Sequence, residues 1–285
     1  MSFATAKQVR RRPDWLKVKL DTSKEFMQTR ALMKAKDLNT VCEEARCPNI
    51  YECWGRQTAT IMILGDICTR SCGFCSVKTG KPSKADYNEA LRTAEAVKSM
   101  GLRHVVITSV DRDDLKNDYG ATIWADTIKN IRQVSSNCTI EVLTPDFRNY
   151  SPAYKKVFNA KPDIFSHNIE CIRRISTQVR PQSNWNRSLH LLKASVEWGL
   201  ETKTGMMVGL GESDKEVLGA MKEIADLGIS IFNIGQYLQP TINHLPVQRF
   251  VHPDTFDLYK KWGLELGFKV VESGPLVRSS YHADE

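Results

Sequence analysis

The chain has 285 residues, of which 41% are hydrophobic, and its 40 Lys and Arg against 33 Asp and Glu give a formal net charge of +7. This length can bury a full core, as one large domain or as a domain with extensions. No apolar run approaches the ~20 residues of a membrane-spanning helix, and the basic, polar amino terminus lacks the apolar segment of a secretory signal. We therefore expect no membrane partner. A cytoplasmic location follows most simply, though an organelle could house the same chemistry.

The positive charge is concentrated near the amino terminus. The first 36 residues contain ten Lys or Arg and only three Asp or Glu, and Arg10, Arg11 and Arg12 are consecutive. Such a face suits an acidic partner, either protein or nucleic acid, and it equally suits a solvated, partly flexible arm. Pro13 disfavours a helix directly after the arginines. A helix is expected over residues 23–37.

Eight cysteines without a secretory signal favour reduced thiols that bind metal over disulfides. Three of them lie in one short loop at spacing C-x3-C-x2-C, as Cys68, Cys72 and Cys75. A structural zinc site closes with four protein ligands, whereas three thiolates on a four-iron cubane leave one iron without a protein ligand. Gly73 lets the backbone turn tightly, and Phe74 offers a flat apolar surface. The spacing favours a cluster with an open iron over a zinc knuckle or an inert ferredoxin-like site.

Another trio, Cys42, Cys47 and Cys53, lies earlier in the chain at spacing C-x4-C-x5-C. In chain order we call it the first trio, and Cys68, Cys72 and Cys75 the second trio. Two thiol trios so close together are hard to explain as buried core residues. A trio again lacks one ligand for a cubane, so the fourth ligand must come from elsewhere in the chain or from a bound molecule. The isolated Cys138 and Cys171 are expected to be small buried hydrophobic residues.

From residue 59 onward, short apolar segments rich in β-branched residues alternate with helical patterns. The expected strands are residues 60–64, 104–108, 139–143, 163–167, 203–208 and 230–234. Ser213 followed by Glu216 predicts a capping box at the start of one helix, and the last helix is expected over residues 253–266. Each helix returns the chain over a parallel sheet.

Six strand–helix units are too few for a closed eight-stranded barrel. We expect an α/β fold, a partial (βα)6 TIM-like barrel over residues 59–270, with an N-terminal extension (residues 1–58) and a C-terminal tail (residues 271–285). The loop with Cys68, Cys72 and Cys75 follows the first strand, where such barrels place functional residues.

The C-x3-C-x-aromatic-C spacing resembles the signature of the radical S-adenosylmethionine (SAM) enzymes. The resemblance implies the same (βα)6 core and a 4Fe-4S cluster whose open iron chelates the amino and carboxyl groups of SAM. An electron from that cluster then cleaves SAM to methionine and a 5′-deoxyadenosyl radical.

Polar residues near the carboxyl ends of the strands are the expected contacts of SAM. They are Ser109, Asp111, Asn168, Glu170, Arg180 and Glu212, together with Phe74 beside the cysteine loop. Ser109 and Asp111 stand where many radical SAM enzymes have Gly-Gly-Glu, and they equally fit a charged loop cap. Glu170 supplies the carboxylate that a ribose diol prefers, and Asn168 could meet the methionine carboxylate. The glycines before Glu212 resemble the family's G-x-I-x-G-x-x-E region, although a strand-to-helix turn also uses glycines.

The order of the two trios and the terminal Arg278-Ser279-Ser280-Tyr281 resemble the lipoyl synthase family. The resemblance implies an auxiliary 4Fe-4S cluster on the first trio, completed by a serine oxygen of this R-S-S-Y motif, and it favours Ser280 over Ser279. A serine alkoxide is a harder ligand than a thiolate, so its iron should be easier to release.

The implied reaction inserts two sulfur atoms at C6 and C8 of an octanoyl chain on a lysine of a carrier protein. Unactivated C–H bonds have no acidic proton, so a radical from the cofactor is needed to open them. The implied carriers are the lipoyl domain of a 2-oxoacid dehydrogenase E2 or the glycine cleavage H protein, which Arg10, Arg11 and Arg12 could meet. The implied electron donor is a ferredoxin or flavodoxin.

Two other classes fit less well. A sulfur-inserting enzyme similar to tRNA methylthiotransferases would also use two clusters, but such enzymes usually add an N-terminal domain and a C-terminal RNA-binding barrel, for which the extensions are too short. We therefore expect no nucleic-acid partner. A non-catalytic metal-binding protein would hold metal without cleaving SAM.

Overall fold

The computed structural model describes residues 11–18, 23–36, 38–44, 47, 49–55 and 60–280. One curved sheet dominates it, in the strand order β1-β2-β5-β6-β7-β8-β9-β10. Its parallel strands are β2 (Thr60–Ile63), β5 (His104–Ser109), β6 (Thr139–Leu143), β7 (Ile164–Ser166), β8 (Glu201–Val208), β9 (Ile231–Gln236) and β10 (Val270–Gly274). The short β1 (Asn39–Thr40) pairs antiparallel with β2 at one edge.

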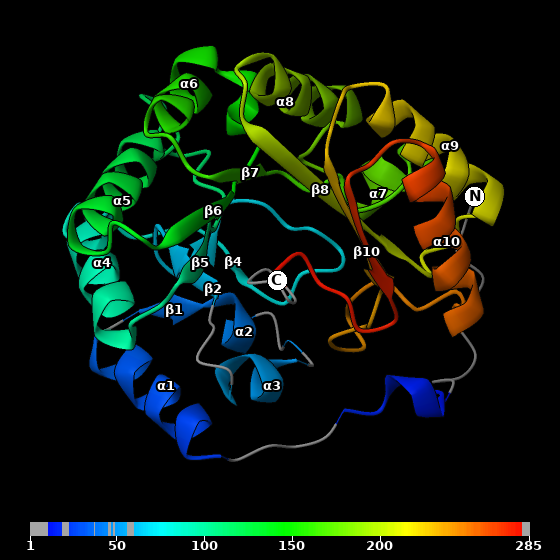
Figure 1. Ribbon diagram of the computed structural model, residues 1–285, viewed down its shortest axis with the longest axis horizontal. Coiled ribbons are helices and arrows are strands. Elements are labelled where there is room, and N and C mark those ends of the chain that lie inside the picture. Colours follow the sequence, from blue (N-terminus) through cyan, green and yellow to red (C-terminus); the bar gives the residue numbers. More distant parts are fainter. Residues whose placement is uncertain are drawn as a thin grey trace.

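Helices surround the sheet on its outer side (Figure 1). They are α4 (Glu89–Met100), α5 (Ala121–Val134), α6 (Ser151–Asn159), α8 (Trp185–Glu197), α9 (Asp214–Ala225) and α10 (Pro253–Glu265). The structure confirms the partial (βα)6 barrel, since each of the six predicted strands forms within a residue or two of its predicted position. One helix lies between most successive strands, as a parallel sheet requires.

The structure adds a seventh parallel strand that the sequence did not predict. β10 pairs with β9 residue by residue, from Val270 opposite Ile231 to Gly274 opposite Gly235. Its segment is short and contains Glu272 and Ser273, so no apolar run marks it as a strand. The boundary expected at residue 270 falls on the first residue of this strand.

Two helices show how local sequence sets the element ends. The predicted capping box forms at α9, where Ser213 Oγ accepts from Glu216 N at 3.3 Å and a Glu216 carboxylate oxygen accepts from Ser213 N at 2.9 Å. Val217, Met221 and Ile224 of this helix are fully buried. α10 likewise forms within a residue of its predicted range and buries Phe256.

The N-terminal extension packs on the barrel through aromatic side chains. α1 (Lys24–Ala35) has Ser23 as its N-cap, so it starts within a residue of its predicted position. Phe26 stacks on Tyr51 of α3 (Ile50–Gly55) with ring centroids 5.2 Å apart. Within η1 (Asp14–Leu16), Leu16 is buried, and Trp15 meets His252 edge-on at 5.1 Å. Arg11 and Arg12 are exposed. Arg10, the first of the predicted basic trio, lies outside the described residues.

The segment after β10 turns back into the middle of the ring of strands (Figure 1). Leu276 O accepts a hydrogen bond from Asn49 Nδ2 at 2.7 Å, and the backbone of Val277 lies directly against β9. A Cβ atom on Gly235 would stand 2.1 Å from Val277 O, so only glycine permits this approach. Tyr281, the last residue of the R-S-S-Y motif, lies outside the described residues.

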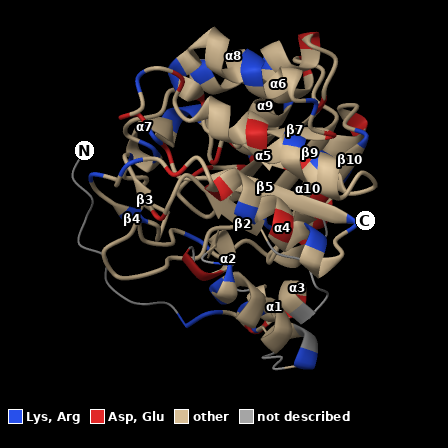
Figure 2. Cartoon of the chain, turned by 90° about the vertical axis from the view of Figure 1, so that its left-hand side faces the viewer, with Lys and Arg blue, Asp and Glu red and all other residues tan. Residues whose placement is uncertain are grey.

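Basic and acidic residues are both distributed over the helices, strands and loops of the chain (Figure 2). Several of them form ion pairs, for example Arg174 with Glu216 at 2.6 Å. Within the described part of the chain, no helix is long and apolar enough to cross a membrane.

Candidate functional site

A cavity of about 540 Å³ lies at the carboxyl ends of the strands and is lined by cysteines of both trios. Cys42 and Cys47 come from the N-terminal extension, whereas Cys68, Cys72 and Cys75 come from the loop after β2. Ser279 and Ser280 of the C-terminal tail also line it. Cys53, the third cysteine of the first trio, is partly buried in α3 against the core and is not among the lining residues. The fold thus brings five of the six predicted thiols and both serines to one cavity.

The loop of the second trio is fixed by backbone hydrogen bonds on both sides. Cys68 ends β3 (Ile67–Cys68), which pairs with β4 (Lys78–Thr79), and its Sγ accepts from Asp111 N at 3.3 Å. Gly73 N donates to Val179 O at 2.8 Å, and His244 Nε2 lies 2.9 Å from Cys75 O. The loop is therefore held by neighbours from separate segments of the barrel, namely the loop after β5, the end of α7 (Ser176–Val179) and the loop after β9.

Burial raises the pKa of the thiols that face the cavity. The pKa rises to about 11 for Cys42, to about 11 for Cys68 and to about 12 for Cys72. Nearby charge adds to burial, from Cys47 at Cys42 and from Asp111 at Cys68. The free thiols therefore hold their protons, and binding of iron must displace them.

The thiol arrangement fits clusters better than it fits single ions. Within the ranges that the structure describes, no three His, Cys, Asp or Glu side chains gather tightly enough to hold one metal ion. Ligands of a 4Fe-4S cluster bind different irons, so they stand further apart than the four ligands of one zinc. Five thiols from the two trios face one cavity, an arrangement that suits clusters rather than a single ion.

The tail serines lie on different sides of the cavity. Thr60 Oγ1 donates to Ser280 Oγ at 2.7 Å, and the backbone of the same Thr60 contacts the Cys42 thiol. Ser279 Oγ instead accepts from Asn168 Nδ2 at 2.6 Å. Ser280 therefore belongs to the side of the first trio.

Four of the expected SAM contacts gather near the second trio. Asn168 Nδ2 also donates to Glu170 at 3.1 Å, and the Arg180 guanidinium donates to Asn168 O at 2.9 Å. Arg180 Nε is buried and lacks a hydrogen-bond acceptor, so it can still take one. Burial raises the pKa of Glu170, and the charge of Arg180 acts against that rise. Asp111 lies beside Cys68, with a carboxylate oxygen 3.8 Å from the sulfur, and burial likewise raises its pKa.

Ser109, Phe74 and Glu212 complete the expected set, with different outcomes. Ser109 and Phe74 line the cavity, although the Ser109 hydroxyl donates to Val110 O at 2.8 Å. Glu212 is buried outside the cavity lining, where its carboxylate accepts from Gly209 N at 2.6 Å and Leu210 N at 2.9 Å. Its carboxylate closes its own strand-to-helix turn, so the geometry does not support the expected contact with SAM.

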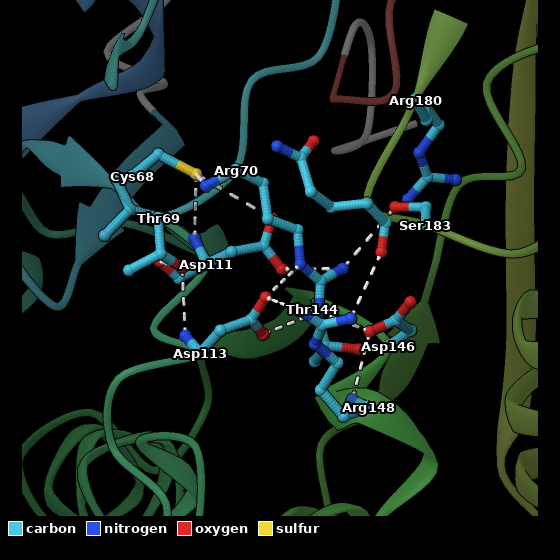
Figure 3. A network of polar contacts seen from close by, with 12 residues as sticks. Cys68, Thr69, Arg70, Asp111, Asp113, Thr144, Asp146, Arg148, Arg180 and Ser183 are labelled. Atoms are coloured by element: carbon cyan, nitrogen blue, oxygen red, sulfur yellow. Dashed lines mark hydrogen bonds and ion pairs between the residues drawn. The ribbon is translucent and has the colours of Figure 1, made fainter. Parts of the chain in front are cut away.

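Sequence reasoning missed a buried polar network behind the second trio (Figure 3). Arg70, which lies within the cysteine loop, is buried among Asp111, Asp113 and Asp146. Next to it, His167 is held between Thr144 O at 2.8 Å and Ser188 Oγ at 2.9 Å. A charged residue between two cysteines was the one available signal, but its partners are distant in sequence.

Cys138 and Cys171 are both buried, at 2% and 0% exposure. This confirms the prediction that they are small core residues. The cysteines that remain in the described structure are the two trios.

Comparison with known proteins gives consistent matches over nearly the whole chain. Residues 62–224 match the family model of the radical SAM superfamily, and residues 3–47 match that of the N-terminal domain of lipoyl synthase of the radical SAM family. Lipoyl synthase from Rubrobacter xylanophilus is 53% identical over 276 residues, covering 96% of this chain and 86% of the relative. The mitochondrial lipoyl synthase of Nematostella vectensis is 48% identical, covering 96% of this chain and 94% of the relative.

Solved structures share the fold at much lower identity. SuiB from Streptococcus suis bound to S-adenosylmethionine superposes with a TM-score of 0.59 at 12% identity, covering 87% of this chain and 60% of that chain. Methylornithine synthase PylB gives a TM-score of 0.56 at 11% identity, covering 88% and 78%. These likenesses support the barrel architecture alone.

Proposed function

Since the chain belongs to the lipoyl synthase family of radical SAM enzymes, which bind a 4Fe-4S cluster and SAM and insert sulfur, we propose that this cavity holds two clusters. In the proposal, Cys68, Cys72 and Cys75 bind the SAM-cleaving cluster. Cys42, Cys47, Cys53 and Ser280 bind an auxiliary 4Fe-4S cluster. When bound, the first supplies the electron that cleaves SAM, and the second supplies the sulfur for C6 and C8 of the octanoyl chain.

The observation that carries this proposal is the shared cavity. Thiols of both trios and Ser280 line one space, so a substrate chain between them can meet both clusters without leaving the protein. The Thr60 contact to Ser280 and Cys42 supports Ser280 over Ser279 as the fourth ligand of the auxiliary cluster.

The lining suits both SAM and an aliphatic chain. Asn168, Glu170, Arg180 and Asp111 are proposed to orient SAM, because they offer donors and carboxylates on the side of the second trio. Apolar side chains complete the wall and exclude water from the reacting carbon atoms. They include Met62, Val110, Leu143, Met206 and Leu238.

Enzymes of this family act on protein-bound octanoyl groups, so a lipoyl carrier is the partner of this chain. We propose a lipoyl domain of a 2-oxoacid dehydrogenase E2 or a glycine cleavage H protein as that carrier, and a ferredoxin or flavodoxin as electron donor, in the cytoplasm. Arg12 is exposed and lines the mouth of the cavity, which supports docking of an acidic carrier there. The functional units proposed are residues 1–58, 59–270 and 271–285.

The test compares Cys42→Ala with Cys68→Ala after anaerobic reconstitution, using SAM, a reductant and an octanoyl-lysyl peptide under mass spectrometry. Cys42→Ala should cleave SAM without forming lipoyl product, and Cys68→Ala should do neither. The wild-type chain should bind roughly eight irons, four for each cluster. Lipoyl formation by Cys42→Ala would refute the sulfur-donor assignment, and RNA that co-purifies with the chain would favour a nucleic-acid substrate.

A further inference from the structure

Arg70 lies inside the cysteine loop, between Cys68 and Cys72, and its side chain is only 1% exposed. Its guanidinium forms a two-bond fork with Asp113, from Nε to Oδ2 and from Nη2 to Oδ1, both at 2.8 Å. Nη2 also donates to Asp146 Oδ1 at 2.7 Å. A guanidinium has five N–H donors in a rigid fork, so it can bind several carboxylates in a fixed arrangement.

The partners of Arg70 come from separate parts of the barrel (Figure 3). Asp113 belongs to the loop after β5, and Asp146 to the loop after β6. Nη1 lies 3.4 Å from Ser183 Oγ, in the segment that precedes α8. One buried side chain therefore joins the cysteine loop to three neighbouring segments.

Arg70 also contacts the Cys68 sulfur and the carboxylate beside it. Cys68 Sγ accepts from the backbone N–H of Arg70 at 3.4 Å and from that of Asp111 at 3.3 Å. An Asp111 carboxylate oxygen stands 3.8 Å from the same sulfur, and the other lies 3.1 Å from Arg70 Nη1. Without the guanidinium, a buried carboxylate beside this sulfur would lose its counter-charge.

The charges behind the loop are balanced as a group. Asp113 also pairs with Arg148 at 2.9 Å, and Asp146 with Arg187 at 2.7 Å. Burial would lower the pKa of Arg70, but the hydrogen bonds of Asp113 and the charges of Asp111 and Asp146 raise it overall, so Arg70 stays charged. Three arginines thus face three aspartates, and Arg70 is the one that belongs to the cysteine loop.

We propose that Arg70 is a positioning residue for the SAM-cleaving cluster, which fixes the cysteine loop against the loops after β5 and β6 and neutralises Asp111 beside Cys68. This inference rests on the proposed function, in which Cys68, Cys72 and Cys75 hold that cluster. Hydrogen bonds and charge near the sulfurs set the reduction potential of an iron–sulfur cluster. Loss of Arg70 leaves extra negative charge that opposes the incoming electron, so the potential of this cluster should fall.

The experiment uses the full chain, reconstituted anaerobically, as wild type, Arg70→Gln, Arg70→Lys and the double variant Arg70→Gln/Asp111→Asn. Iron content, thermal unfolding, the SAM-dependent electron paramagnetic resonance signal and the reduction potential are measured. Arg70→Gln should bind full iron but lower the potential, alter the SAM-dependent signal and slow SAM cleavage by about tenfold or more. Arg70→Lys should restore the reduction potential and the rate of SAM cleavage only in part, since an ammonium cannot form the fork. Asp111→Asn in the Arg70→Gln background should move the potential back toward the wild-type value.

Arg132→Gln is the matched control, because Arg132 also bridges two segments, through Asp163 at 2.7 Å and Cys138 O at 3.0 Å, but at the opposite ends of the strands. A wild-type potential and signal in both Arg70 variants would overturn the proposal. So would a loss of thermal stability that accounts for all other changes, because Arg70 would then serve the fold alone. A Cys68→Ala variant that keeps the SAM-dependent signal would instead refute the cluster assignment itself.

Discussion

Asn168 donates a 2.6 Å hydrogen bond to the hydroxyl of Ser279, while the next residue, Ser280, accepts from Thr60 on the opposite side of the cavity. Two adjacent serines thus face two different sites. We expect Ser280→Ala to reduce sulfur insertion by more than about tenfold and to lower auxiliary iron, because it removes a proposed cluster ligand. Ser279→Ala should keep full iron and weaken SAM binding by less than about tenfold, since it removes one hydrogen bond.

Product mass spectrometry, iron content and SAM affinity distinguish the two serines. The pair forms its own control, because both changes remove one hydroxyl from the same segment. If Ser279→Ala loses auxiliary iron and Ser280→Ala does not, the assignment must be reversed.

Charge reversal at Arg11 and Arg12 should weaken use of the carrier protein. Both are exposed and Arg12 reaches the mouth of the cavity, so Arg11→Glu/Arg12→Glu should raise the KM for an acidic octanoylated carrier by about tenfold at low salt. Added salt should reduce the difference, because it screens exposed charges.

The matched control is Lys129→Glu/Lys155→Glu, which makes the same charge change on the exposed sides of α5 and α6. Turnover of a neutral octanoyl-lysyl peptide should be unchanged in both double variants. An unaltered salt dependence with the carrier would exclude docking at Arg11 and Arg12.

Much of the fold was predictable because the parallel strands bury both faces and appear in the sequence as short apolar runs. β10 was not predicted because Glu272 and Ser273 interrupt its apolar run. In the described structure it pairs with β9 alone. Among site residues, the cysteines were visible because their spacing is local. Arg70 was not, because its partners Asp113 and Asp146 lie 43 and 76 residues away.

Glu212 illustrates the opposite case. Its glycine-rich context suggested a ligand contact, yet its carboxylate binds the amides of Gly209 and Leu210, three and two residues before it. Sequence pattern identifies a strand-to-helix turn, but it does not tell whether an acidic side chain closes that turn or faces the cavity, so a contact of Glu212 with SAM stays a prediction that this geometry does not support.

The buried His167 should make the protein less stable in mild acid. Burial, followed by the charge of Arg180, lowers the pKa of His167 from 6.5 to about 4, against the opposing charge of Asp146. Between these values the unfolded chain binds a proton that the folded chain does not, so this stability is present above pH 6.5 and is lost as the pH falls toward 4. From pH 7.5 to 5.5 the free energy of unfolding should fall by about 1 kcal/mol through this group.

Anaerobic denaturant titrations at pH 5.5 and 7.5 measure this effect. His167→Gln should be less stable at pH 7.5, because it disturbs the contacts to Thr144 and Ser188, but it should lose that part of the pH dependence. His190→Gln, at an exposed histidine, is the control and should follow the wild type. An unchanged pH dependence in His167→Gln would show that His167 does not titrate differently on unfolding.

Gly235→Ala should separate SAM cleavage from sulfur insertion. The added Cβ would stand 2.1 Å from Val277 O, and a backbone carbonyl cannot swing aside as a side chain can, so the tail with Ser279 and Ser280 must move. Sulfur insertion should fall by more than about tenfold, while SAM cleavage stays within about threefold, because the second trio lies on a different loop. Limited proteolysis should cut the displaced tail faster than in the wild type. Gly219→Ala on α9, where a Cβ meets nothing within 4 Å, is the control and should leave activity unchanged. Equal sulfur insertion by Gly235→Ala and wild type would show that the reaction does not depend on where the tail lies.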